Sequence, residues 1–160
     1  MITDICGGII GVSGQAGYNK IENCANKADI SGESIIGGIV SSVNDNTYII
    51  GCYNTGNVNS KSTHAGGIVG SNGSTPKIIN CYNTGNVTGN AEIGGIIAMD
   101  GTTSMCYNSG IIDGGEKANA GGIIGWGDTA EDCYNEGSVS GYSFVGGILG
   151  NAQSATNSYN

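Results

Sequence analysis

The fold is decided by the stretch Asn80-Cys81-Tyr82-Asn83-Thr84-Gly85-Asn86-Val87-Thr88-Gly89, which is soon followed by Gly94-Gly95-Ile96-Ile97. The triplet Cys-Tyr-Asn returns at Cys52, Cys106 and Cys133, and weaker copies begin at Cys24 and Ser158. Glycine pairs recur in a constant order relative to the triplet, beginning at Gly7, Gly37, Gly66, Gly94, Gly121 and Gly146. The chain is therefore one unit of 25 to 30 residues written about six times.

Each unit contains three short apolar segments separated by turn residues. In one copy the first segment is Gly66-Gly67-Ile68-Val69-Gly70, the second ends in Cys81-Tyr82-Asn83, and the third is Asn86-Val87-Thr88. Polar loops such as Ser71-Asn72-Gly73-Ser74-Thr75-Pro76 lie between the segments and have the composition of turns. Three strand-length segments without a helix between them predict one coil of a parallel β-solenoid. We expect an all-β fold of about six coils, with three short strands per coil, as a single domain over residues 1–160.

The composition favours stacked coils over an ordinary globular core. The 160 residues include 31 glycines, one proline and one phenylalanine, which leaves few bulky side chains for a core of normal thickness. Five basic residues against 13 acidic ones give a net charge of −8, and no basic stripe indicates nucleic acid as a partner. No run of about 18 apolar residues predicts insertion into a membrane.

Stacking predicts columns of equivalent residues, because successive coils of a solenoid lie about 4.8 Å apart. Alternation along the second strand places its cysteines on one side and its tyrosines on the other, and we take the cysteine side as inward. The predicted interior columns are Ile9, Ile39, Ile68, Ile96, Ile123 and Ile148 in the first strand, Cys24, Cys52, Cys81, Cys106 and Cys133 in the second, and Ile30, Val58, Val87, Ile112 and Val139 in the third. A neighbouring aliphatic column faces outward if the first strand continues, or is buried if the chain bends; it comprises Ile10, Val40, Val69, Ile97, Ile124 and Leu149.

The asparagine of the triplet predicts a second kind of column. Each side-chain amide would bond to the next in a ladder at a corner of the coil, formed by Asn26, Asn54, Asn83, Asn108, Asn135 and Asn160. A glycine follows two residues later in four units, at Gly56, Gly85, Gly110 and Gly137. These glycines predict either a positive φ or a close approach of two backbones.

The cysteines are interpreted as small buried thiols. No Cys-x-x-Cys pair suggests a metal site, and parallel Cβ vectors within a column disfavour disulfides. Ser158 in the same column supports a space-filling role, and no cofactor is expected. Cys6 precedes the first glycine pair at a position that is apolar in the other units, so it also indicates packing; fraying of the first coil would make it the most reactive thiol.

The tyrosines of the triplet are the candidate partner surface. They point away from the cysteines and would form an exposed stripe of Tyr53, Tyr82, Tyr107, Tyr134 and Tyr159. One interpretation is that stacking of the rings stabilises this face of the sheet. The other is a surface that contacts a host protein or a glycan.

Catalysis finds little support in the sequence. His64 is the one histidine and is interpreted as an ordinary loop residue, so a serine or cysteine nucleophile has no evident base. Asp128, Glu131 and Asp132 are the densest group of acids and are interpreted as a solvated turn. Calcium binding is an alternative, although the acids do not fall in one column. We therefore expect no enzyme activity and no catalytic or metal-binding residue.

The combination of Gly66-Gly67-Ile68-Val69-Gly70 with the stretch from Asn80 to Gly89 resembles the GLUG motif. This repeat is found in bacterial surface proteins and in the non-catalytic region of immunoglobulin A-cleaving metalloproteases. The resemblance implies an exported repeat array, extracellular or at the cell surface, that serves as a rigid stalk or an adhesive module. No His-Glu-x-x-His occurs in the chain, so the resemblance does not imply peptidase activity.

The two ends of the sequence show no polar cap for a solenoid. The chain opens at Met1-Ile2-Thr3-Asp4 directly before a glycine pair and stops at Tyr159-Asn160. We expect either a segment of a longer array or a filament subunit, and in both cases open terminal coils that stack end to end on a copy of the chain or on neighbouring repeats. A carbohydrate-binding or polysaccharide-processing β-helix is the further alternative.

Overall fold

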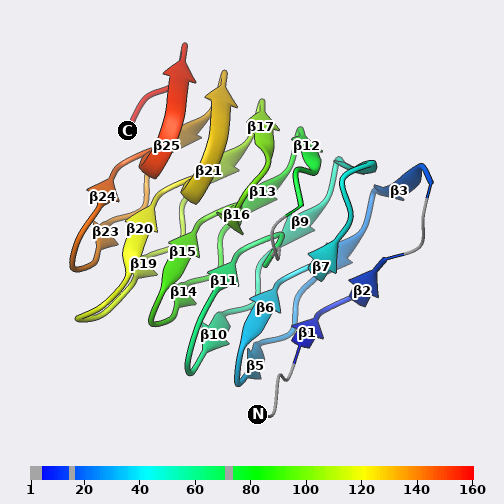
Figure 1. Ribbon diagram of the computed structural model, residues 1–160, viewed down its shortest axis with the longest axis horizontal. Helices are drawn as coiled ribbons and strands as arrows, with labels where there is room; N and C mark the ends of the chain where they lie inside the picture. Colours follow the sequence, from blue (N-terminus) through cyan, green and yellow to red (C-terminus); the bar gives the residue numbers. More distant parts are fainter. Residues whose placement is uncertain (1–4, 15–16, 71–73) are drawn as a thin grey trace.

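The computed structural model describes residues 5–14, 17–70 and 74–160. Within these ranges the chain is all strands and turns, and Figure 1 shows them wound into a parallel β-solenoid, as predicted. The part of the turn at Ser71-Asn72-Gly73 and the opening Met1-Ile2-Thr3-Asp4 lie outside the described residues. No helix in the described ranges is long and apolar enough to cross a membrane.

The strands that lead into the glycine pairs form one parallel sheet. In register, Ala65 faces Ile36 on one side and Ile93 on the other, so the glycine pairs stack directly on one another. Across the described residues this sheet has six strands, β1 (Ile5–Gly7), β6 (Ile35–Gly37), β11 (Ala65–Gly66), β15 (Glu92–Gly94), β20 (Asn119–Gly121) and β24 (Val145–Gly146).

The chain turns after each glycine pair and forms a second face. A short pair of strands, β2 (Ile10–Ser13) and β7 (Val40–Val43), begins this face. The described residues add a seven-stranded sheet made of β3 (Asn19–Glu22), β8 (Thr47–Ile50), β12 (Lys77–Ile79), β16 (Ile97–Met99), β17 (Thr102–Ser104), β21 (Ile124–Glu131) and β25 (Leu149–Thr156).

Two five-stranded parallel sheets complete the described coils. The first carries the Tyr-Asn part of the triplet and comprises β4 (Ala25–Asn26), β9 (Tyr53–Asn54), β13 (Tyr82–Asn83), β18 (Tyr107–Asn108) and β22 (Tyr134–Asn135). The second comprises β5 (Ile30–Gly32), β10 (Val58–Ser60), β14 (Val87–Thr88), β19 (Ile112–Asp113) and β23 (Val139–Ser140). Together the sheets make about five full turns, close to the predicted six coils.

Each turn is divided more finely than the predicted three strands. The coil that begins at β6 contains β6, β7, β8, β9 and β10. The first predicted strand is broken at Gly38-Ile39, and the second is broken at the residue before the cysteine. Two additional bends therefore close the coil.

The residue before each cysteine explains the second bend. It has a positive φ in every unit, and the equivalent residues are Asn23, Gly51, Asn80, Met105, Asp132 and Asn157, with φ between 48° and 62°. Asn, Asp and Gly tolerate this left-handed conformation best. This requirement is absent from the predictions, although the recurrence of Asn, Gly and Asp at one position is its signal in the sequence.

The glycines after the triplet have a different role. Gly56, Gly85, Gly110 and Gly137 do not have a positive φ, which removes one of the two predicted explanations. A Cβ atom on Gly85 would overlap the carbonyl oxygen of Gly56 in the preceding coil. Close approach of two backbones is thus what requires glycine here.

The interior contains both aliphatic columns of the first strand. Ile39 and Val40 are each fully buried, as are Ile68 and Val69, because the bend at the glycine pair turns both side chains into the core. The alternative of an outward-facing column is therefore wrong for these coils. Ile9 is also a correction: it was predicted as interior but is 48% exposed, because no coil in the described residues covers it.

Candidate functional site

The asparagine side chains form a continuous ladder through the described coils. Each Nδ2 donates to Oδ1 of the next asparagine at 2.6 to 2.8 Å, along Asn26, Asn54, Asn83, Asn108, Asn135 and Asn160. The second amide proton of Asn83 is used as well, since Nδ2 donates to the carbonyl of Gly85 at 2.7 Å. These amides are buried from Asn26 to Asn135, so the ladder satisfies polar groups that would otherwise be costly to bury.

The ladder also contacts the glycine pairs. A Cβ atom on Gly67 would lie 2.5 Å from Cγ of Asn83, and the same crowding recurs at Gly38, Gly95 and Gly122 against the asparagine of their own coil. The two sequence anchors of the repeat thus pack against each other across each coil. This contact explains why they keep the same order in every unit.

The cysteines are free thiols that point into the core. Cys52, Cys81, Cys106 and Cys133 are at most 1% exposed, whereas Cys24 and Cys6 are partly exposed. Each thiol of the column donates to the carbonyl two residues before it, at 3.2 to 3.5 Å. Ser158 takes the same place in the last unit and accepts a hydrogen bond from the amide of Cys133.

The tyrosines line the opposite side of the same strands, and their rings stack on one another. Tyr53 and Tyr82 are parallel, with centroids 4.9 Å apart, and Tyr134 stacks on Tyr159 at 5.2 Å. Tyr107 lies 4.3 Å from Tyr134 and donates from Oη to Oε2 of Glu136 at 2.8 Å. Stacking covers the ring faces, so the stripe offers a partner mainly ring edges and hydroxyl groups. The stacked pairs Tyr53–Tyr82 and Tyr134–Tyr159 leave a sugar fewer open aromatic faces than separate rings would.

His64 has a partner that the sequence analysis missed. It lies just before β11, and its Nδ1 is 2.7 Å from Oε2 of Glu92 in the next coil. Both side chains are about four-fifths buried, with exposed fractions of 18% and 21%. The hydrogen bond from His64 lowers the pKa of the Glu92 carboxyl, although burial opposes the shift. Both residues stand two positions before a glycine pair, and aligning the units on those pairs would have brought them together.

The acidic residues do not converge on one site. Asp128 accepts a hydrogen bond from Gln153 at 3.1 Å, and burial with the nearby Asp128 raises the pKa of Asp100. Glu131 lies in β21, and Asp132 occupies the left-handed position before Cys133. No group of three or more His, Cys, Asp or Glu among the described residues could hold a metal ion.

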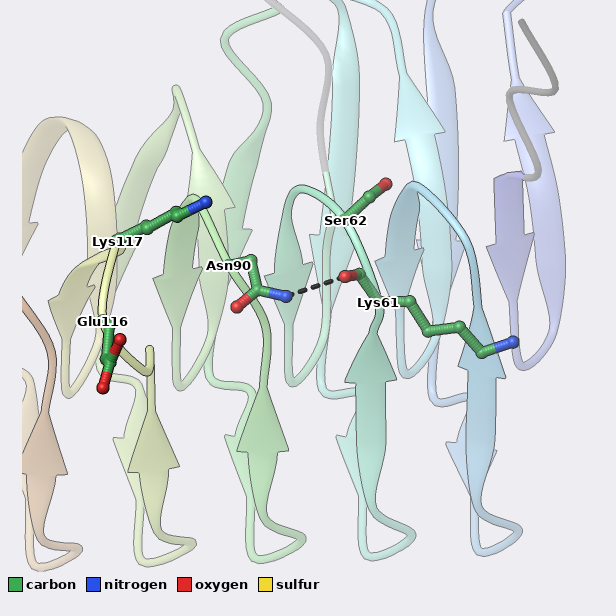
Figure 2. A pocket seen from close by; sticks show the side chains of 5 residues that line it. All are labelled: Lys61, Ser62, Asn90, Glu116 and Lys117. Carbon is green, nitrogen blue, oxygen red and sulfur yellow. Dashed lines mark hydrogen bonds between the residues drawn. The ribbon is translucent and has the colours of Figure 1, made fainter.

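An open hollow lies on the edge where the third strand connects to the next coil. It has a volume of about 470 Å³ and is lined by Lys61, Ser62, Asn90, Glu116 and Lys117. Asn90 donates to the carbonyl of Lys61 at 2.7 Å, which joins two adjacent loops. Figure 2 shows that Lys61 extends away from Asn90 and that Glu116 and Lys117 point in different directions. The lining side chains therefore do not surround a common point, as a catalytic or tight binding site would require.

A comparison with known proteins supports the repeat assignment. The family model described as the GLUG motif matches residues 61–88. No curated protein and no solved structure matches the chain. The matched residues contain the glycine pair at Gly66 and the Cys-Tyr-Asn triplet at Cys81, and the other coils stack on them in register. Such a motif on a solenoid fits a structural repeat module and suggests a non-catalytic one. The resemblance to the GLUG repeat family is thus confirmed for residues 61–88.

Proposed function

We propose that this chain is a rigid structural element, a stalk or adhesive module, of an exported protein at the cell surface. The observation that supports it most is the unbroken ladder from Asn26 to Asn160, which ties the coils together through buried hydrogen bonds. Surface location and export rest on the resemblance to GLUG repeats of bacterial surface proteins. The adhesive part rests on the tyrosine stripe, where Tyr82 and Tyr159 are 39% and 65% exposed.

Changing the number of units tests the structural role. One chain lacks residues 81–105, so that Asn80 is followed by Cys106, and a second carries two extra copies of that unit. If the coil is a modular spacer, the length measured by small-angle scattering changes by about 4.8 Å per unit while the cross-section stays constant. A length that does not follow the number of units, in chains that circular dichroism shows to be folded, would contradict the proposal.

A second proposal is that copies stack end to end, as in a filament. The first described coil exposes Ile9 and Val12 by 48% and 57%, and the equivalent of Ile9 in the next coil, Ile39, is fully buried. A further coil, whether from the same chain or from a second copy, would cover these side chains. Sedimentation at increasing concentration should then show open-ended association that the change Ile9→Lys abolishes. A protein that stays monomeric at every concentration would contradict end-to-end stacking.

A further inference from the structure

The cysteine column holds its sulfur atoms in one orientation through adjacent coils. Tyr82 pairs in register with Tyr53 and Tyr107, so Cys81, the residue before it, lies between Cys52 and Cys106. Each thiol donates to the carbonyl two residues before it, which shows that the side chains share one direction. Because parallel strands lie about 4.8 Å apart, successive sulfurs are separated by about that distance.

This spacing suits a metal ion bound by two sulfurs. A bond from a metal to a thiolate is about 2.3 Å long, which is close to half the strand spacing. A cation placed between two stacked sulfurs would therefore bind both in a straight line, without an enlarged cavity. Soft thiolate ligands favour Cu(I), zinc and iron–sulfur clusters, and of these Cu(I) accepts two thiolates in a linear arrangement. A four-ligand zinc site is not offered, since no group of three or more metal-binding side chains occurs in the described ranges.

We propose that Cys52 and Cys81 form a two-coordinate thiolate site for Cu(I). Two thiols release their protons to solvent, one Cu(I) forms two bonds to sulfur, and no oxidation state changes. The pair passes from neutral to a net charge of −1 in the core. Two backbone amides offset that charge, because Cys24 N donates to Sγ of Cys52 and Cys52 N donates to Sγ of Cys81, each at 3.4 Å.

The burial of the pair determines how a metal ion reaches it. Cys52 and Cys81 both belong to the buried core, where each is at most 1% exposed. Both sulfurs are buried, so the ion enters through local opening of the coils and binding is slow.

The test compares two thiols in adjacent coils with two thiols in coils that are not adjacent. Ag(I) is the probe, because it shares the preference of Cu(I) for two thiolates and does not change oxidation state under these conditions. One protein keeps only Cys52 and Cys81, through Cys6→Ser, Cys24→Ser, Cys106→Ser and Cys133→Ser. Its matched control keeps only Cys52 and Cys133, through Cys6→Ser, Cys24→Ser, Cys81→Ser and Cys106→Ser. Both contain two thiols and four substitutions, and native Ser158 shows that the column accepts serine.

Titration against excess methionine, followed by silver–thiolate absorbance, measures the affinity of each protein. The adjacent pair should bind one Ag(I) at least about 100-fold more tightly, because the second thiolate is held at a high effective concentration. Equal affinities would overturn the proposal.

A second measurement keeps the native column and does not depend on the folding of the multiple variants. The full chain with Cys6→Ser alone is melted with and without Ag(I). A ligand of the folded state raises Tm, whereas a ligand of thiols in the unfolded chain lowers it. A higher Tm supports the site, and an unchanged or lower Tm overturns it.

Discussion

Two corners of the same coil differ in how much their sequence varies. The Asn corner, residues 51–56 and their equivalents 23–28, 80–85, 105–110 and 132–137, repeats nearly the same residues in every turn. The variable edge, residues 61–64 and their equivalents 33–34, 89–91, 114–118 and 141–144, changes in both length and composition. In the Asn corner each residue is constrained by the same residue in the next coil, through hydrogen bonds and backbone contact. The variable edge carries the open hollow of Figure 2 instead. Residues that repeat in every coil are thus those constrained by stacking, whereas residues that vary between coils lack that constraint.

The largest expected effect comes from breaking the ladder with Asn83→Asp. The new carboxylate would face the carbonyl of Gly85 and Oδ1 of Asn108, where the amide now donates at 2.7 and 2.8 Å. An unpaired buried charge should lower the free energy of unfolding by about 3 kcal/mol, measured by urea denaturation. The control is Asn86→Asp, because exposed Asn86 accepts a hydrogen bond through Oδ1 that a carboxylate keeps. Equal losses of unfolding free energy in Asn83→Asp and Asn86→Asp would show that the ladder does not stabilise the fold more than an exposed asparagine does.

The next largest effect is expected for Gly85→Ala. The added methyl group would overlap the carbonyl oxygen of Gly56, so the coils would have to separate locally. Overpacking of this kind costs about 2 kcal/mol, which thermal and urea denaturation would detect. Gly11→Ala is the matched control, because nothing lies within 4 Å of its added Cβ. Equal changes in unfolding free energy for Gly85→Ala and Gly11→Ala would contradict the role of close backbone approach at Gly85.

A gain in stability is expected from a substitution at Met105, in the Asn corner. Met105 is the one residue at the left-handed position that is not Asn, Asp or Gly, and its φ is 52°. Met105→Asn should stabilise the fold by about 1 kcal/mol, because asparagine adopts this conformation at lower cost. Met105 is 55% exposed, so little packing is lost. Met105→Leu should leave the unfolding free energy unchanged, and a similar gain from leucine would exclude relief of backbone strain as the cause.

The smallest effect belongs to the variable edge and depends on pH. Because His64 lowers the pKa of Glu92 below its usual 4.5, ionised Glu92 stabilises the fold above that pH. This contribution is lost as the pH falls through the lower, folded-state pKa. Glu92→Gln should therefore flatten the acid side of the stability profile by less than about 1 kcal/mol. Glu33→Gln should leave the stability profile unchanged, because the carboxylate of Glu33 lies 3.9 Å from the ammonium group of exposed Lys61. If stability depends on pH in the same way in the unsubstituted chain, Glu92→Gln and Glu33→Gln, the role of Glu92 is refuted.

The sequence was sufficient for the solenoid and its columns because stacking places identical residues over one another. The Cys-Tyr-Asn spacing alone separated inward thiols from outward rings. It could not place the first bend, since a strand that turns at Gly38-Ile39 and one that continues have the same local pattern. It also missed the contact of His64 with Glu92, which joins two different residue types from different coils. Such a pair is found only by aligning the units on their glycine pairs, because the two residue types differ and their positions correspond only in the register of the fold.

The two corners also assign different roles to the triplet. Its asparagine and cysteine are enclosed by neighbouring coils, and only its tyrosine reaches the surface. The structural role therefore rests on buried residues, whereas the tyrosine stripe and the variable edge carry exposed side chains.

Hydrogen exchange of the backbone amides tests the central claim, that the stacked Asn corner is the rigid part of the module. The amides of Thr55, Thr84 and Ser109 donate to Asn26, Asn54 and Asn83 in the preceding coil at 2.9 to 3.0 Å. Those of Ser62, Asn90 and Ala91 make the corresponding bonds at the variable edge. We predict that the first group exchanges only through global unfolding and the second through local opening, with markedly lower protection. Equal protection at the two corners would contradict the account.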